Sequence, residues 1–168
     1  MMATTSSGTA KVTLPADDQI LITREFNAPR HLVYKAWTTP ELVRRWWHAK
    51  RGEVTTADID LRVGGRWRWV MVTPDGFEVG FHGEYRELVP DERIVCTEVY
   101  EGIPVPEGAP EPAALNTLTL TETDGRTTLS LLVQHDSKAT RDAVIESGME
   151  DGLQDALDLV EELAVSLR

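Results

Sequence analysis

The sequence contains a single cysteine, Cys96, among its 168 residues. One thiol excludes an internal disulfide and a zinc site built from several cysteines. The four histidines show no HExxH or similar ligand spacing, so we expect neither a metal nor another cofactor. The first residues lack the charged and apolar regions of an export signal, and the expected compartment is therefore the cytoplasm.

The sequence also lacks long apolar runs and an excess of positive charge. No apolar stretch approaches the roughly 18 residues of a membrane-spanning helix, so we expect no membrane insertion. The 17 Lys and Arg against 28 Asp and Glu give a formal net charge of −11, which disfavours nucleic acid and anionic membranes as partners. The sequence carries no indication of an oligomeric state.

The hydrophobic content of 41% is enough for one globular core in a chain of this length. Residues 1–18 are rich in Thr, Ser and Ala, and we expect them to form a flexible lead-in. Residues 19–168 show no linker or internal repeat. They are therefore predicted to form one domain.

The clearest element is an amphipathic helix predicted from Ser137 nearly to the C-terminus. Apolar residues recur along one stripe at helical spacing, and Gln154, Asp158 and Glu161 fall on the opposite, acidic face, which we expect to be solvated. Ser137 is suited to cap the start. The apolar stripe comprises Ile145, Met149, Leu153, Ala156, Leu157, Val160, Leu163, Ala164 and Leu167.

Two glycines, Gly148 and Gly152, lie one turn apart in this helix. Each costs about 1 kcal/mol relative to Ala in a helix interior. They are consistent with a kink or with close contact to a strand, and also with space left for a guest molecule beneath the helix. The two interpretations are compatible.

The remaining chain predicts an α+β fold in which a curved antiparallel sheet surrounds the final helix. Two short helices begin near Pro29 and Pro40, after the first strand. The proline-rich residues 101–114 are expected to be an irregular loop, either a lid or a tolerated insertion. Seven strands are predicted from residue alternation, over residues 19–26, 54–61, 66–72, 77–89, 93–100, 115–122 and 127–134.

Several segments in this order resemble the family related to the C-terminal domain of the activator of Hsp90 ATPase, a branch of the START-like or Bet v 1-like superfamily. They are ITREFNAPRHLVYKAWTTPELVRRWW, DLRVGGRWRWVM, GEYRELVPDERIVCTE and ESGMEDGLQDALDLVEEL. The resemblance implies a helix-grip fold of seven antiparallel strands with a largely apolar cavity between the sheet and the C-terminal helix.

The family includes binders of hydrophobic molecules, and polyketide cyclases occur elsewhere in the superfamily. Many relatives carry a Trp where this chain has Leu153, and the smaller side chain is expected to enlarge the cavity. The chain also lacks the additional N-terminal domain of the eukaryotic co-chaperone.

Strand parity and the helical stripe predict which side chains line this cavity. The set is rich in aromatic residues and has few polar groups, as suits an apolar pocket. Its expected members are Val33, Trp37, Trp47, Ile59, Trp67, Trp69, Met71, Phe81, Tyr85, Glu87, Thr97, Met149, Leu153 and Leu157. A buried Arg24–Glu87 pair is expected either as a structural ion pair or as a polar anchor for a ligand.

The first functional hypothesis is non-covalent capture of a hydrophobic small molecule, without catalysis. The second is a cyclase- or hydrolase-like enzyme that uses pocket groups such as Tyr85 or Glu87; no catalytic residue is assigned. The third is a protein-interaction or co-chaperone module that uses the acidic helix face. A buried acid beside a tyrosine would favour the second hypothesis, and a large exposed apolar patch the third.

Overall fold

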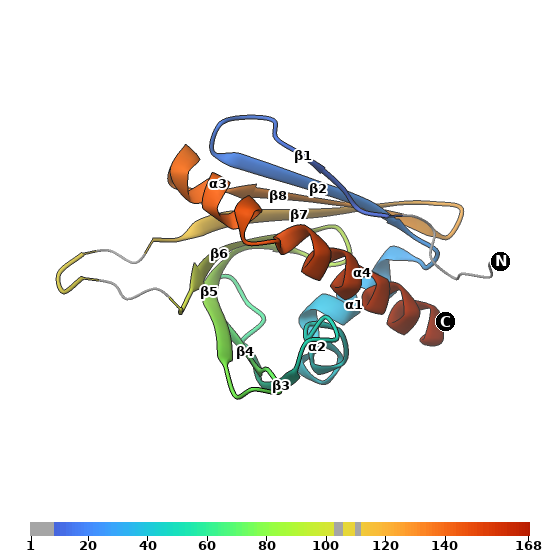
Figure 1. The fold of residues 1–168 in the computed structure, drawn as a ribbon. Coiled ribbons are helices and arrows are strands. Elements are labelled where there is room, and N and C mark those ends of the chain that lie inside the picture. The colour runs from blue at the N-terminus through green and yellow to red at the C-terminus, as the bar shows by residue number, and fades with distance from the viewer. Residues whose placement is uncertain (1–8, 103–105, 110–111) are drawn as a thin grey trace.

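The computed structural model describes residues 9–102, 106–109 and 112–168 (Figure 1). It confirms the α+β class and the two short helices after the first long strand. Its elements, in chain order, are β1 (Lys11–Thr13), β2 (Gln19–Phe26), α1 (Arg30–Thr38), α2 (Pro40–Trp46), β3 (Glu53–Ile59), β4 (Arg66–Val72), β5 (Glu78–Val89), β6 (Arg93–Tyr100), β7 (Ala114–Thr123), β8 (Arg126–Gln134), α3 (Lys138–Glu146) and α4 (Met149–Ser166).

The strands form one antiparallel sheet in the order β1-β2-β8-β7-β6-β5-β4-β3. The predicted count of seven is one too low, because β1 adds an edge strand through pairs such as Val12–Ile22. This strand lies within the predicted lead-in, of which residues 1–8 fall outside the described part. The sheet bends around α4, α2 lies against β3, and α1 lies between α2 and α4 (Figure 1).

The C-terminal segment is two helices rather than the single one predicted. Ser137 caps α3 as expected, because its Oγ accepts a hydrogen bond from the backbone N–H of Thr140 at 3.1 Å. The chain then breaks at Gly148, whose φ is +83°, a left-handed conformation that glycine adopts without steric cost. The kink interpretation therefore holds for Gly148. Gly152 lies inside α4 and is not in close contact with a strand.

A buried ion-pair cluster attaches α4 to the sheet. Arg24 of β2 is 2% exposed, and its guanidinium contacts Asp158 at 2.6 Å and Glu161 at 2.9 Å. Glu161 also accepts the backbone N–H of Asn27 at 2.8 Å. The predicted Arg24–Glu87 pair is therefore wrong. The predicted solvation of Glu161 is wrong too, since buried charges require partners and this helix carboxylate supplies one.

The chain's N-terminal part contacts the same helix. The side-chain amide of Gln154 accepts a hydrogen bond from the backbone N–H of Ala10 at 3.0 Å and donates one to its carbonyl at 2.8 Å. This pairing connects the segment just before the edge strand β1 to α4. Gln154 was predicted on the solvated face; its amide instead satisfies backbone groups of a segment 144 residues away.

The proline-rich segment 101–114 is only partly described. A turn closes with a hydrogen bond from the N–H of Ala109 to the carbonyl of Pro106 at 3.0 Å, and Ala114 already belongs to β7. Residues 103–105 and 110–111 lie outside the described residues, so the alternatives of lid and insertion stay predictions. No helix in the described part is both long and apolar enough to cross a membrane.

Candidate functional site

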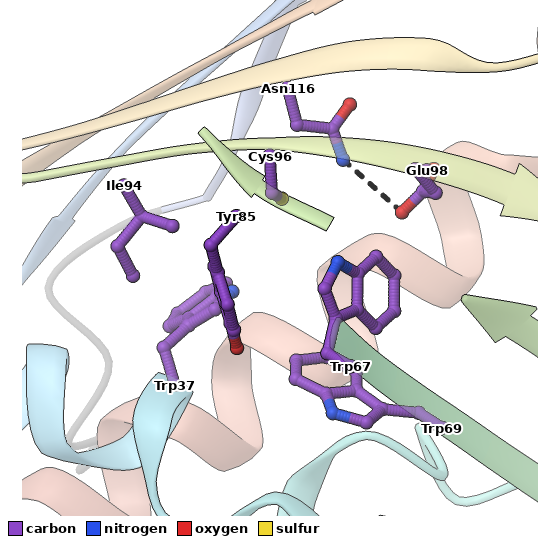
Figure 2. A pocket seen from close by; sticks show the side chains of 8 residues that line it. All are labelled: Trp37, Trp67, Trp69, Tyr85, Ile94, Cys96, Glu98 and Asn116. Carbon is purple, nitrogen blue, oxygen red and sulfur yellow. Dashed lines mark hydrogen bonds between the residues drawn. The ribbon is translucent and has the colours of Figure 1, made fainter. Parts of the chain in front are cut away.

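A cavity of about 60 Å³ lies between the inner face of the sheet and α1 (Figure 2). The predicted position beneath the C-terminal helix is wrong, because no described residue of α4 lines this cavity. Four aromatic side chains form most of its wall, and four residues of the central strands close the opposite side. It is lined by Trp37, Trp67, Trp69, Tyr85, Ile94, Cys96, Glu98 and Asn116. Five different elements, α1, β4, β5, β6 and β7, thus contribute to one small space.

Strand register explains why these side chains meet. Tyr85 of β5 lies opposite Cys96 of β6, which lies opposite Asn116 of β7. Residues directly opposite each other on neighbouring strands project to the same face. The three side chains therefore stand in line across the inner face of the sheet.

A second row of residues that face each other across neighbouring strands includes Glu98. Trp67 lies opposite Gly83 in the β4–β5 pairing, and Glu98 lies opposite Ala114 in the β6–β7 pairing. The pairs His82–Val99 and Tyr85–Cys96 place Gly83 opposite Glu98. Glu98 therefore stands between a glycine and an alanine, the two smallest residues, and the Gly83 position admits the Trp67 indole close to the backbone.

A larger residue at Gly83 would displace the Thr97 backbone and the Trp67 indole. A Cβ atom there would overlap the carbonyl oxygen of Thr97 and lie 2.7 Å from Nε1 of Trp67. The indole of Trp67 therefore lies over the Gly83 backbone, on the side of the sheet where Glu98 projects. Figure 2 shows the Trp67 nitrogen turned toward the strand that carries Cys96.

The indoles form a connected aromatic wall, but only some have hydrogen-bond partners. The Trp67 and Trp69 rings lie 5.1 Å apart, and Trp46 packs edge-on against Trp69 at 5.8 Å. Nε1 of Trp46 donates to the carbonyl of Ala36 at 2.9 Å. Nε1 of Trp67 and of Trp69 is buried, and neither has a hydrogen-bond partner among the described residues.

The polar groups of the cavity gather around Glu98. Asn116 Nδ2 donates to Glu98 Oε2 at 3.2 Å, while Asn116 Oδ1 is buried and has no partner among the described residues. Burial raises the pKa of the Glu98 carboxyl, and the hydrogen bond from Asn116 opposes this shift only in part. The charged form is disfavoured because the lining supplies no cationic side chain.

Burial also shifts the pKa of the other two titratable groups in the lining. It raises the pKa of the Cys96 thiol to about 12, with a further contribution from the negative charge of Glu98. It raises the pKa of the Tyr85 hydroxyl as well. Cys96 is therefore a protonated, unreactive thiol near neutral pH. Chemically, the cavity offers aromatic surface, hydrogen-bond donors and acceptors, and one carboxylic acid.

The structure brings together only part of the predicted site. Trp37, Trp67, Trp69 and Tyr85 line the cavity. Val33 and Leu157 are core residues, 0% and 2% exposed, that do not reach it. The other apolar members are partly buried against the same core, outside the cavity lining: Trp47, Ile59, Met71, Phe81, Met149 and Leu153. The proposed enlargement at Leu153 stays a prediction.

Two predicted positions face away from the cavity. Glu87 is exposed and pairs with Arg93 at 2.7 Å, because a register shift between Tyr85 and Glu87 breaks the alternation of β5. Thr97 lies between the inward-facing Cys96 and Glu98, so it occupies the outer face, where its hydroxyl accepts the N–H of Glu84 at 2.9 Å.

The predictions omitted Ile94, Cys96, Glu98 and Asn116 as lining residues. A signal for the first three was present, since they alternate along β6 with Ile94 at a core position. Asn116 alternates with Leu118 and Leu120 in the same way. A polar residue at an inward position of a strand is a candidate for a binding role because its burial needs a partner.

A larger hollow of about 190 Å³ lies on the outer face of the sheet, between the side chains of Arg66, His82 and Arg86. Its walls combine charged side chains with Val99 and Ala113, and Arg86 already pairs with Glu84 at 3.1 Å. It contains no Phe, Tyr or Trp side chain among the described residues. Within the described ranges, no three His, Cys, Asp or Glu side chains converge as a metal site would require.

The bent antiparallel sheet closed around a C-terminal helix defines a helix-grip protein. The sequence model of the family described as Activator of Hsp90 ATPase homolog 1-like protein matches residues 27–164. The chain belongs to this family. No curated protein matches the sequence.

Solved structures of bacterial proteins share the fold over nearly their whole length. A protein of Rhodobacter sphaeroides is 24% identical, with a TM-score of 0.83 over 95% of this chain and 99% of its own. One from Mycobacterium smegmatis is 23% identical, with a TM-score of 0.81 over 96% and 100%. One from Chromobacterium violaceum is 26% identical, with a TM-score of 0.75 over 89% and 98%.

Proposed function

We propose that the protein binds a hydrophobic small molecule in the cavity between the sheet and α1, without transforming it. The observation that carries the proposal is a space walled by three indoles and a phenol ring, in which two indole N–H groups have no partner within the described residues. Binding sites combine apolar walls with a few convergent polar groups in this manner.

The size of the space limits how a ligand would enter. An apolar cavity of about 150 Å³ holds a benzene molecule, whereas this one measures about 60 Å³. A ring-sized ligand must therefore displace side chains. Trp37 is only partly buried and is the one helix residue of the lining, so its displacement would open the cavity without disturbing the sheet.

The experiment uses p-xylene, a single-ring apolar probe, and follows the five tryptophan indole N–H resonances by NMR. We expect the resonances of Trp67 and Trp69 to shift in a saturable manner. Cys96→Leu adds carbon atoms inside the cavity and should weaken binding by about tenfold or more. Val95→Leu adds carbon on the outer face of the same strand and should leave binding unchanged. Absence of any saturable shift in the unmodified protein would refute the proposal.

A second candidate function, acid catalysis, is favoured by one observation. Glu98 is a half-buried carboxylic acid with a raised pKa in the same cavity as the Tyr85 hydroxyl, and active sites use such acids as proton donors. The test incubates the protein with an extract of small molecules from its host. A mass change that requires Glu98, and is lost in Glu98→Gln, would support catalysis; ligands recovered unchanged would support capture.

A protein-interaction function has no comparable support. The large hydrophobic side chains exposed within the described residues come from separate parts of the chain: Leu14 beyond β1, Leu61 and Val63 between β3 and β4, Phe77 between β4 and β5, and Tyr100 at the end of β6. They are not the single apolar patch that docking a partner would favour.

A further inference from the structure

One end of the cavity contains a set of hydrogen-bonding groups that is incomplete within the described residues. Trp67, only 5% exposed, presents an unpartnered N–H donor, and Asn116 presents an unpartnered carbonyl acceptor. Between them, the Glu98 carboxyl uses one oxygen to accept the Asn116 amide at 3.2 Å. A buried polar atom without a partner destabilises the folded protein, so a ligand that satisfies these atoms gains affinity and orientation.

The space beside these groups is built into the sheet register. Glu98 is flanked across the strands by Gly83 and Ala114, and the Trp67 indole covers Gly83, with its Nε1 only 2.7 Å from the position that a Cβ would take. A small ligand group entering this end would thus meet a donor from Trp67 and acceptors from Glu98 and Asn116. We call these three residues the polar end.

The charged groups of the cavity lining restrict the class of ligand that can bind. Among the described residues, no Lys, Arg or His side chain lines the cavity, so an anionic ligand would lose its hydration there without gaining a cationic partner. An ammonium group would also lose its hydration, in exchange for one carboxyl whose charged form burial already disfavours. The group that best complements the polar end is uncharged and both donates and accepts hydrogen bonds.

We propose that Trp67, Glu98 and Asn116 make the cavity selective for an uncharged ligand whose hydroxyl group occupies the polar end. The hydroxyl oxygen accepts from Trp67 Nε1, and its hydrogen is donated to Glu98 or to Asn116 Oδ1. The aromatic wall holds the apolar body of the ligand. This proposal rests on the proposed function, because it specifies the ligand of the same cavity.

The test compares 4-methylphenol with p-xylene, which carries a methyl group in place of the hydroxyl. We expect 4-methylphenol to bind about tenfold more tightly by calorimetric titration, consistent with one to two net hydrogen bonds. Its binding should also move the Trp67 indole N–H resonance downfield, and p-xylene should not. Trp67→Phe, which retains a ring but not the N–H, identifies this resonance and should reduce the preference severalfold.

A second variant, Glu98→Met, keeps the side-chain length and removes both oxygens. The ratio of the 4-methylphenol and p-xylene affinities, both measured in this variant, should fall to about one, and the variant keeps the proposal testable if Trp67→Phe does not fold. Equal affinity of the two probes in the unmodified protein would overturn the polar-end proposal alone. Tighter binding of 4-methylbenzylamine or 4-methylbenzoate would overturn it in favour of a charged ligand. Failure of every probe to bind would refute the proposed function itself.

Discussion

At the scale of single residues, two carboxyl groups close to each other in the chain have opposite electrostatics. Glu98 projects into the interior, and burial raises its pKa. Glu101 contacts Arg68 at 2.9 Å and His82 at 2.7 Å on the outer face, and hydrogen bonding from Arg68 is the main reason that its pKa falls to about 2. The surroundings of each glutamate, rather than its residue type, decide whether its charged or its neutral form is favoured.

This difference predicts opposite pH dependences for two matched substitutions. The pKa of Glu98 is raised in the folded state. This residue therefore lowers the free energy of unfolding as the pH rises above 4.5, the ordinary pKa of a glutamate carboxyl. Glu98→Gln removes this cost. The free energy of unfolding of the variant, relative to the unmodified protein, should therefore increase between about pH 4.5 and the folded-state pKa.

Glu101→Gln is the control with the reverse sign. The lowered pKa of Glu101 stabilises the protein above about pH 4.5, and this contribution is lost as pH falls toward 2. The variant should be less stable than the unmodified protein at neutral pH, with a difference that shrinks in acid. Urea denaturation at several pH values measures both trends. A pH-independent effect of Glu98→Gln would contradict the interior placement of this carboxyl.

At the scale of elements, α4 is positioned by charge as well as by its apolar stripe. Arg24 and Glu161 are 2% and 1% exposed, so their pairing is buried on both sides. Removing one partner leaves the other charge in the core, at a typical cost of about 3–5 kcal/mol. Asp158 is partly exposed and compensates Arg24 only in part.

Glu161→Ala should therefore destabilise the protein by about 3–5 kcal/mol, measured by urea denaturation at neutral pH. Glu162→Ala is the matched control, because this neighbouring carboxylate is exposed and its removal should change stability by less than about 0.5 kcal/mol. Similar small losses in both variants would show that the ion-pair cluster does not hold α4 in place.

The two helix glycines should respond differently to Ala. Gly148 has φ of +83°, a conformation that costs an L-residue about 1–2 kcal/mol, so Gly148→Ala should lower stability. A Cβ at Gly152 would meet only the Arg51 guanidinium, at 4.0 Å, so Gly152→Ala should raise stability by about 0.5–1 kcal/mol. Thermal melts compare the two; stabilisation by both would mean that α3 and α4 can join into one helix.

At the scale of the whole molecule, much of the fold could be predicted from residue alternation. Period-two patterns in β4 and β5 placed Trp67, Trp69 and Tyr85 on the inner face, and local turn residues set most strand ends. The eighth strand was missed because β1 is a short edge strand without a long alternating pattern. Its pairing with β2 and the Gln154–Ala10 contact depend on tertiary packing.

The candidate site was harder to predict than the fold. A one-residue register shift after Tyr85 turned Glu87 outward, and local sequence carries little information about such a bulge. Glu98 and Asn116 lie on β6 and β7, two paired strands that are separated in the sequence by residues 101–113. Their hydrogen bond therefore depends on long-range register, which alternation in one strand does not define.

The central claim is that the cavity of the folded molecule holds a small ligand. Native mass spectrometry of the protein purified from its own host tests this most directly, because a captured ligand adds to the mass of the chain. We expect an added mass that disappears on denaturation and is absent from Cys96→Leu, in which the cavity is filled, but is retained in Val95→Leu. A spectrum at the bare mass of the chain, or an added mass that Cys96→Leu retains, would contradict the account.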